Sequence, residues 1–163
     1  MAMKGALSHL ISAYARPGQL DWIGLRPRRR AAVVMVESAE ILGEGLQGDH
    51  GASDKRAITL FQSAHLPVVA AFLGRDTVPP ELLRRNLMVS GINLSALKGR
   101  EVAIGKAIVE ITGICAPCSR MEEALGHGGY SAMRGHGGWC ARVLQPGTVT
   151  LGDQVVPLTS RAP

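Results

Sequence analysis

Short apolar segments follow one another along most of this sequence, and turn-forming residues separate them at short intervals. Segments with alternating or β-branched residues occupy 20–25, 31–41, 57–61, 87–89, 101–104, 107–114, 139–144, 148–151 and 154–158. Many short strands with frequent turn signals are typical of an antiparallel sheet that closes on itself, rather than of alternating strand–helix–strand units. We therefore expect a mainly β fold, a barrel of mostly antiparallel strands over about 20–158 with a few peripheral helices.

Shorter stretches predict the helices. Residues 5–15 carry apolar side chains at helical spacing, and Pro17 and Gly18 end that segment. A second helix is expected over 63–73, with Gly74 as its stop, and a third over 120–125. No internal repeat and no linker rich in Gly, Ser or Pro divides the chain. We expect a single domain over 1–163.

The overall charge and the apolar runs limit which kinds of partner the protein could bind and in which cellular compartment it would occur. A formal charge of +5 favours anionic partners. Aromatic residues make up only 4% of the chain and are not interleaved with basic ones, so a small anionic ligand is favoured over nucleic acid. The longest apolar run, 66–73, is too short for a membrane span. The first residues lack a signal-peptide core, and three cysteines fit a reducing compartment, so we expect a cytoplasmic protein without membrane contact.

Two cysteines, Cys115 and Cys118, stand just before the third predicted helix. Ser119 and Glu122 fit a capping box, which places Cys118 immediately before a helix N-terminus. Unpaired backbone amides and the cation of Arg120 would favour a thiolate there. Cys115 ends an apolar alternating run, and we interpret it as a small buried residue.

Several interpretations of the cysteines remain open. Cys115 and Cys118 form a C-x-x-C pair, although no strand–helix–strand context supports a redox role. With His127, His136 and Cys140 they would supply zinc ligands, although the spacing is irregular. Cys118 alone would act as a soft thiolate toward sulfur or a soft metal. In the last interpretation Cys118 is purely structural, since a free cysteine is commonly a buried apolar residue.

Five motifs occur in a fixed order along the chain: GLQGDHG at 45–51, KRAITLF at 55–61, LRRNLMVSGINL at 83–94, APC at 116–118 and GTVTLGDQV at 147–155. In this order, and with these gaps, they resemble the MOSC family, domains named for the C-terminal part of molybdenum cofactor sulfurase and also found as stand-alone bacterial proteins. The likeness runs from about Trp22 to the last strand. It implies a β-barrel, which agrees with the strand pattern.

The resemblance implies that Cys118 is the functional cysteine. It would carry sulfur as a persulfide or ligate molybdenum of a bound molybdenum cofactor (molybdopterin). The implied activities are sulfur transfer and molybdenum-cofactor-dependent reduction of N-hydroxylated compounds. The implied partners are a sulfur-donating cysteine desulfurase and a redox protein. Pyridoxal phosphate belongs to such a desulfurase and is not expected in this chain.

The motifs also supply candidate cofactor contacts. Asp49 and His50, in a turn over 48–51, would hold the cofactor or position a proton, although a turn requires such residues anyway. This chain has a single His at a place where many relatives carry two, which weakens a metal role for the turn.

Basic residues near strand starts are the remaining candidates. Arg56 and Arg85 would bind phosphate, and Asn86 would read the edge of a pterin ring, all at strand ends around a barrel mouth. Of the neighbouring Arg84 and Arg85 we expect one to point inward. Arg134, in a glycine-rich segment over 126–138 that would act as a lid, is a further phosphate contact.

A second interpretation is that the protein is a binding module that catalyses no reaction. In that interpretation the basic barrel docks a partner protein or nucleic acid through the run Arg26–Arg30, and Cys118 is structural. Binding to nucleic acid would weaken steeply with ionic strength, whereas a small-molecule site would respond much less.

Overall fold

The computed structural model describes residues 2–51 and 54–159, so that residues 1, 52–53 and 160–163 of the expected domain lie outside it. The strands are β1 (Gly18–Leu25), β2 (Val34–Val36), β3 (Ser38–Leu42), β4 (Gly45–Leu46), β5 (Ile58–Gln62), β6 (Leu87–Ser90), β7 (Glu101–Ile104), β8 (Ala107–Ile114), β9 (Trp139–Gln145), β10 (Gly147–Thr150) and β11 (Gln154–Pro157). The segments expected as strands all contain strands, although the segment over 31–41 divides into two.

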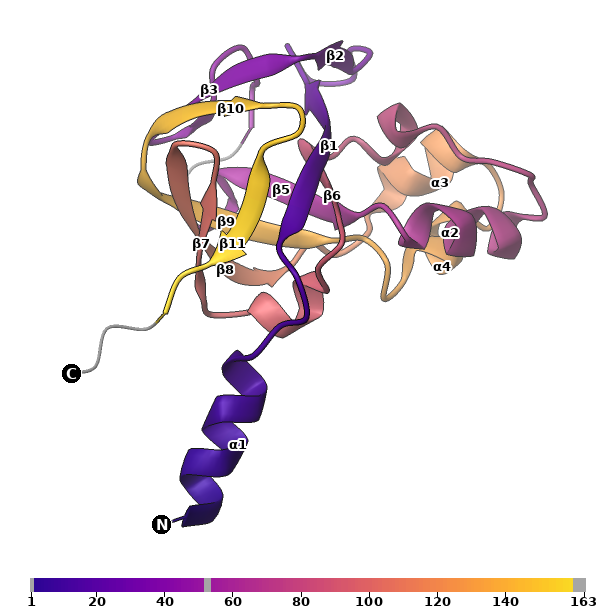
Figure 1. Ribbon diagram of the computed structural model, residues 1–163. Helices are drawn as coiled ribbons and strands as arrows, with labels where there is room; N and C mark the ends of the chain where they lie inside the picture. The colour runs from indigo at the N-terminus through magenta and orange to yellow at the C-terminus, as the bar shows by residue number, and fades with distance from the viewer. Residues whose placement is uncertain (1, 52–53, 160–163) are drawn as a thin grey trace.

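Seven of the strands close into a barrel, in the order β11-β7-β8-β9-β5-β6-β1 (Figure 1). Closure comes from the pairing of β1 with β11, where Gly18 lies opposite Val155. Strand β2 extends the sheet beyond β1, and a small sheet of β10, β3 and β4 lies across one end of the barrel. The mainly β barrel expected from the strand pattern is confirmed.

One connection departs from the antiparallel pattern. Strands β5 and β6 are parallel neighbours, and the chain between them forms α2 (His65–Leu73) and the 3-10 helix η2 (Pro80–Leu83). The barrel therefore contains one strand–helix–strand unit, which the strand pattern of the sequence did not predict. Two parallel strands require such a crossover, and the predicted helix over 63–73 supplies it. Gly74 ends α2 in the left-handed conformation, with φ of 67°.

Apolar side chains form two separate cores. The first fills the barrel and includes Leu60, Ile111 and Ala141. The second, which includes Phe61 and Met133, lies between the outer face of the barrel wall and the helices α2, α3 (Ser119–Leu125) and α4 (Gly129–Met133). Neighbours on β5 thus point to opposite faces, as the two-residue period of a strand requires.

The glycine-rich segment over 126–138 is more ordered than a loop. It contains α4, whose Ala132 and Met133 are buried in the second core. Two amides at the start of α4, those of Gly128 and Tyr130, donate to the carboxylate of Glu122 at 2.7 and 2.9 Å. These contacts fix the first part of the segment expected as a lid.

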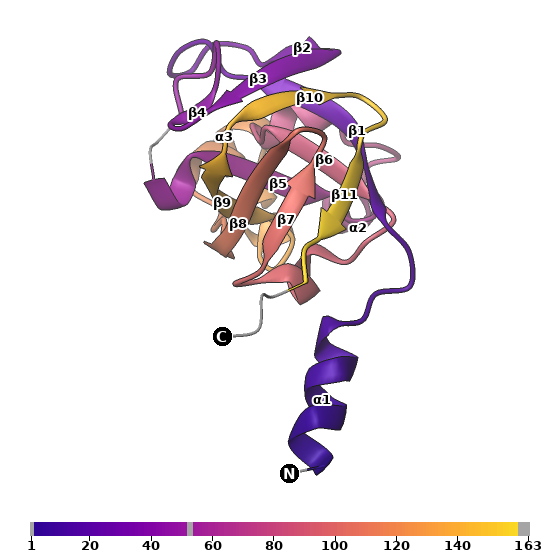
Figure 2. The ribbon, with the colours of Figure 1, turned by 60° about the vertical axis from the view of Figure 1, so that its left-hand side comes forward.

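The N-terminal helix stands apart from the rest of the fold. Helix α1 (Ala2–Ser12) projects away from the barrel (Figures 1 and 2) and ends three residues before the predicted limit. Its apolar Leu7, Leu10 and Ile11 are exposed. Within the described residues, no helix is both long enough and apolar enough to cross a bilayer.

A β-bulge interrupts the pairing of β8 with β9. Ile111 lies opposite Ala141, but the next pair joins Gly113 to Cys140, so Thr112 is an extra residue on β8. Its hydroxyl donates to backbone carbonyls of Lys55 and Cys140. An extra residue inverts the inside–outside alternation of the residues that follow it in a strand. Gly113 and the residues at two-residue spacing after it therefore lie on the outer face of the barrel wall, although Ile111 faces the core.

Candidate functional site

Asp49 lies at the centre of a buried hydrogen-bond network, which we call the Asp49 network and define as Arg26, Asp49, Thr59 and Asn86. The Asp49 side chain is 1% exposed and forms an ion pair of 2.9 Å with Arg26. Its oxygens also accept from the backbone amides of Arg26 at 2.6 Å and Gly51 at 2.9 Å. Burial opposes ionisation, but the hydrogen bonds and charge of Arg26 outweigh it and hold the pKa of Asp49 below its usual value.

Asn86 completes this network and is fully buried. Its amide oxygen accepts from the backbone amide and hydroxyl of Thr59 at 3.1 and 3.2 Å. Its amide nitrogen donates to the carbonyl of Gly24 at 3.1 Å and to the carboxylate of Asp49 at 3.2 Å. An amide side chain offers two donors and one acceptor oxygen with two lone pairs, so these contacts use all of them. The network binds β1, β5 and β6 to the turn over 48–51.

Two adjacent arginines are less completely satisfied. Arg85 is 6% exposed and donates through Nε to the carbonyl of Gly137 at 2.7 Å and through Nη1 to that of Leu83 at 3.3 Å. Arg84 donates through Nη1 to the carbonyl of Ala31 at 2.6 Å. Among the described residues, the buried Nη2 atoms of both arginines have no hydrogen-bond partner. A buried donor without a partner is costly, and an anionic ligand would satisfy it.

Cys118 is exposed and occupies the N-cap of α3. The predicted capping box is wrong, because Ser119 is the first helical residue and Glu122 binds the start of α4 instead of reaching back. Cys118 lies close enough to Arg84 to influence its titration. Burial and then the charges of Arg26 and Arg120 lower the pKa of Arg84, while Asp49 and Cys118 act in the opposite direction. The exposed thiol thus shares its surroundings with several cations.

Cys115 occupies a different position from the one expected. The bulge at Thr112 places it on the outer face of the barrel wall, where its amide donates to the carbonyl of Gly138 at 2.9 Å. It is half-buried there, and its side chain shares this face with that of the buried Cys140. We use the name thiol edge for Arg84, Arg85, Cys115 and Cys118.

The surroundings of Cys115 favour its anion. The hydrogen bond from Cys140 is the largest influence and lowers the pKa of Cys115, burial opposes it, and the charges of Arg85, Arg26 and Arg56 lower it further. The same contact, with burial, raises the pKa of Cys140. Cys115 is the less buried of the two thiols, so it is the one that ionises, with Cys140 as donor.

The remaining candidates are distributed more widely. Arg56 is exposed at the end of the 3-10 helix η1 (Asp54–Arg56), within electrostatic reach of Cys115. His50 is exposed, and its amide donates to the carbonyl of Arg26 at 2.8 Å. Arg134 is exposed beyond the end of α4, and no interaction found for the thiol edge within the described residues involves it.

The structure does not assemble the proposed zinc ligands. No group of three or more His, Cys, Asp or Glu side chains suited to a metal occurs among the residues it describes. His127 lies against Glu122 at 3.8 Å, whereas His136 contacts His65, with 3.3 Å between their Nδ1 atoms. The zinc interpretation of the C-x-x-C pair is therefore wrong for this arrangement.

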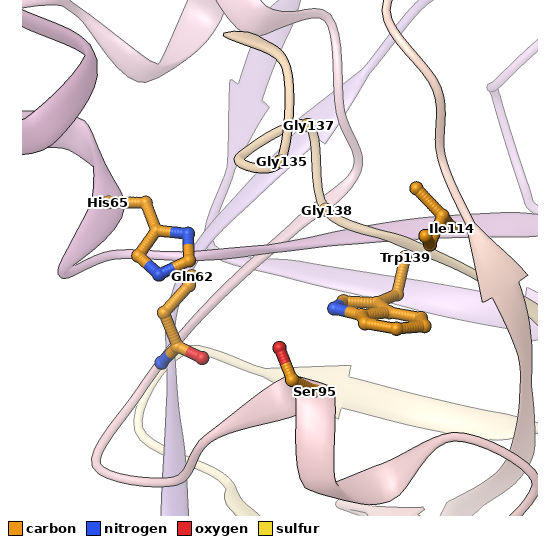
Figure 3. A pocket seen from close by; sticks show the side chains of 8 residues that line it. All are labelled: Gln62, His65, Ser95, Ile114, Gly135, Gly137, Gly138 and Trp139. Atoms are coloured by element: carbon orange, nitrogen blue, oxygen red, sulfur yellow. The ribbon is translucent and has the colours of Figure 1, made fainter.

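Figure 3 shows a hollow beside the end of the glycine-rich segment, lined by the side chains of Gln62, His65, Ser95 and Trp139. Its volume is about 60 Å³, which is small against the several hundred Å³ of common cofactor pockets. The thiols and arginines of the thiol edge do not line it. A ligand of the thiol edge would therefore bind along the outer wall of the barrel and not in this hollow.

A closed seven-stranded barrel with a basic, thiol-bearing outer wall defines the class of this protein. The family model for the MOSC domain matches residues 47–156, which include Asp49, both arginines and all three cysteines. The chain belongs to the MOSC domain family.

Solved structures share the fold. YuaD from Bacillus subtilis has a TM-score of 0.75 and 18% identity, with 86% of this chain and 94% of that chain covered. YiiM from Geobacillus stearothermophilus has a TM-score of 0.74 and 19% identity, with coverage of 88% and 76%. YiiM from Escherichia coli has a TM-score of 0.73 and 19% identity, with coverage of 91% and 73%. A comparison with curated proteins found no match. At these identities the likeness concerns the fold alone.

The cofactor contacts implied by the family motifs did not include Cys115, Cys140 or Arg26, and they left Arg84 as the alternative to Arg85. A signal for Cys115 was present, because an isolated glycine inside a strand pattern, here Gly113, is typical of a bulge. Arg26 offered no such signal, since it belongs to a run of arginines in which the others, Arg28 to Arg30, are exposed.

Proposed function

We propose that the protein handles sulfur at Cys118 and binds an anionic cofactor of the molybdopterin type beside it. The observation that carries this proposal is the exposed Cys118 within electrostatic reach of Arg84, whose buried Nη2 has no partner among the described residues. A thiol is a soft ligand and a good sulfur nucleophile, and a guanidinium suits a phosphate.

The donor set of the thiol edge fits such a cofactor. Arg84 and Arg85 offer unpaired buried donors for a phosphate, and Cys118 offers a sulfur ligand for a soft metal. When bound, the molybdenum cofactor supplies a metal centre for redox and sulfur chemistry. Asn86 and Asp49 use their polar atoms within the protein, so we assign them the role of holding β1, β5 and β6 in place.

As a carrier, Cys118 would receive sulfur from a partner. Its thiolate would attack the outer sulfur of a persulfide on a cysteine desulfurase, the donor S–S bond would break, and the donor would leave as a thiolate. The exposed position of Cys118 permits this direct approach by another protein. Pyridoxal phosphate would act on the desulfurase, not on this chain.

The test compares Cys118→Ser with the parent and with Cys140→Ser, a matched change at a buried thiol. Each protein is incubated with a cysteine desulfurase and cysteine, and each is also isolated from cells that make molybdenum cofactor. We expect one added sulfur at Cys118 or retained molybdenum in the parent and in Cys140→Ser, and neither in Cys118→Ser. Equal molybdenum retention and an unmodified Cys118 in the parent would overturn the proposal.

A further inference from the structure

Cys115 has features of a reactive group that the proposed function does not use. An apolar alternating strand would bury it in the barrel core, but the bulge at Thr112 carries it to the outer wall. There it is half-buried, unlike Cys140, which is 5% exposed. A thiol that is only packing material does not need a partly open position with a polar partner.

Arg85 is held close to the backbone of Cys115. Its Nε and Nη1 are fixed by the carbonyls of Gly137 and Leu83, which leaves Nη2 as the free donor. A Cβ built at Gly137 would lie 2.5 Å from the carbonyl oxygen of Cys115 and 3.5 Å from Nη2 of Arg85, so this guanidinium lies near the backbone of Cys115. A buried, immobilised cation beside a thiol stabilises negative charge on the sulfur.

Cys140 supplies the other stabilising contact. It follows Trp139 on β9 and lies opposite Gly113, so that its side chain shares the outer face with that of Cys115. From this shared face the Cys140 thiol can donate to the sulfur of Cys115 once that sulfur is ionised. Arg85, Arg26 and Arg56 lie within electrostatic reach of Cys115, and Cys140 shares its face of the sheet.

We propose that Cys115 is a second nucleophilic thiol of this site, which accepts a sulfane sulfur from a persulfide while Cys140 and Arg85 stabilise its anion. The Cys115 thiolate attacks the outer sulfur of R–S–S–H, a bond forms between the two sulfurs, and the donor S–S bond breaks. R–S⁻ leaves and takes a proton from water, and Cys115 holds the terminal S–H. No oxidant is needed. The inference rests on the sulfur chemistry of the proposed function and adds a second acceptor to it.

The experiment uses glutathione persulfide as the donor and locates the added sulfur after alkylation. Cys115 and Cys118 share the tryptic peptide 107–120, since cleavage follows Lys106 and Arg120, so fragment ions must assign the sulfur. We expect addition at Cys115 in the parent and in Cys118→Ser. Addition at Cys118 alone overturns this inference and keeps the proposed function. Addition at Cys115 alone supports this inference and removes the sulfur-carrier role of Cys118. Addition at neither cysteine overturns this inference and also removes that carrier role.

A rate measurement separates a built site from an ordinary thiol. Alkylation of Cys115 by iodoacetamide is followed near pH 7 in Cys118→Ser, in Cys118→Ser with Cys140→Ala, and in Cys118→Ser with Cys140→Ser. Losing a hydrogen bond to a charged group should slow the reaction about tenfold in the alanine variant. The serine variant keeps a donor and should retain most of the rate. Equal rates in the three proteins overturn the inference.

Discussion

The Asp49 network and the thiol edge are neighbours that differ in how fully their polar atoms are used. In the network, the side chain of Asn86 has every donor and acceptor engaged, and Asp49 accepts from three residues. In the thiol edge, Arg84 and Arg85 each keep a buried donor without a partner among the described residues, and Cys118 is exposed. Arg26 belongs to the network and also influences the titration of Arg84 and Cys115.

This difference separates residues that hold a site together from residues that meet a ligand. A fully engaged buried group stabilises the fold and has nothing left to offer, whereas an unpaired buried donor costs stability unless something binds it. Family motifs mix both kinds, since the adjacent residues Arg85 and Asn86 fall on opposite sides of the division. Substitutions should therefore affect stability in one region and binding in the other.

The largest effect should come from Asn86→Ala. It leaves Thr59, Gly24 and Asp49 with buried polar atoms unpaired, and we expect a loss of about 3–4 kcal/mol in the free energy of unfolding. Urea titration followed by circular dichroism measures it. Arg134→Ala, at an exposed position, serves as the control and should change stability by less than about 0.5 kcal/mol. A loss below about 1 kcal/mol for Asn86→Ala would remove the distinction between the two regions.

Asp49→Asn should have the next largest effect, about 2 kcal/mol at neutral pH, because it removes the charge that Arg26 pairs with. The pKa of Asp49 is lowered in the folded protein, so its stabilising effect is present above the unfolded value of about 3.9 and is lost as the pH falls through the folded value. Urea midpoints of parent and variant should thus converge below about pH 4. Parallel profiles down to pH 2.5 would contradict the assignment.

Arg84→Ala should act mainly on binding. It removes a guanidinium whose buried Nη2 has no partner among the described residues. Affinity for pyrophosphate, used as a probe of the cofactor's phosphate, should therefore fall about tenfold. The free energy of unfolding should change by about 1 kcal/mol or less, because only the bond to Ala31 is lost. Isothermal titration calorimetry gives the affinity, with Arg29→Ala as an exposed control from the same basic region. Equal affinity for pyrophosphate in the parent and in Arg84→Ala would show that Nη2 of Arg84 does not bind the phosphate.

The smallest effect should come from His65, outside both regions. Burial and the neighbouring His136 lower its pKa, so the folded state prefers the neutral ring. Stability that depends on this ring is present above the unfolded pKa of about 6.5 and declines as the pH falls below it. Because the side chain is only partly buried, His65→Gln should reduce the decline between pH 7 and pH 5 by only roughly a few tenths of a kcal/mol. Differential scanning calorimetry at both pH values measures it, and a larger decline in the variant would contradict the sign.

The barrel could be predicted from the sequence because its signals are local. Runs such as 101–104 and 107–114 alternate as strands do, and β7 and β8 have those bounds. The parallel pairing of β5 with β6 could not be predicted in the same way, since it depends on where α2 packs and not on the two strands themselves. For helix α1 the element could be predicted, but its packing could not. A helical pattern predicts the helix without indicating whether its apolar side chains are buried against another element.

The site could be predicted only in part, for a related reason. Cys118 and Arg85 were indicated by family motifs, and their roles stay predictions that the experiments above address. The capping box failed because Glu122 has a second set of amides within reach, contributed by a helix that the sequence had not indicated. Cys115 was assigned to the core because alternation was carried through Thr112, and only the pairing with β9 reveals the extra residue.

The bulge at Thr112 also sets how this segment tolerates change. The side chain at position 112 could vary widely without moving the sulfur of Cys115 to the other face. The face to which a strand residue points depends on how many residues precede it and not on which residues they are. Deleting a single residue there would send Cys115 into the barrel interior and part it from Arg85, with hardly any alteration in composition. In comparisons among relatives, aligned length between the barrel-facing Ile111 and the cysteine is thus more informative than percentage identity.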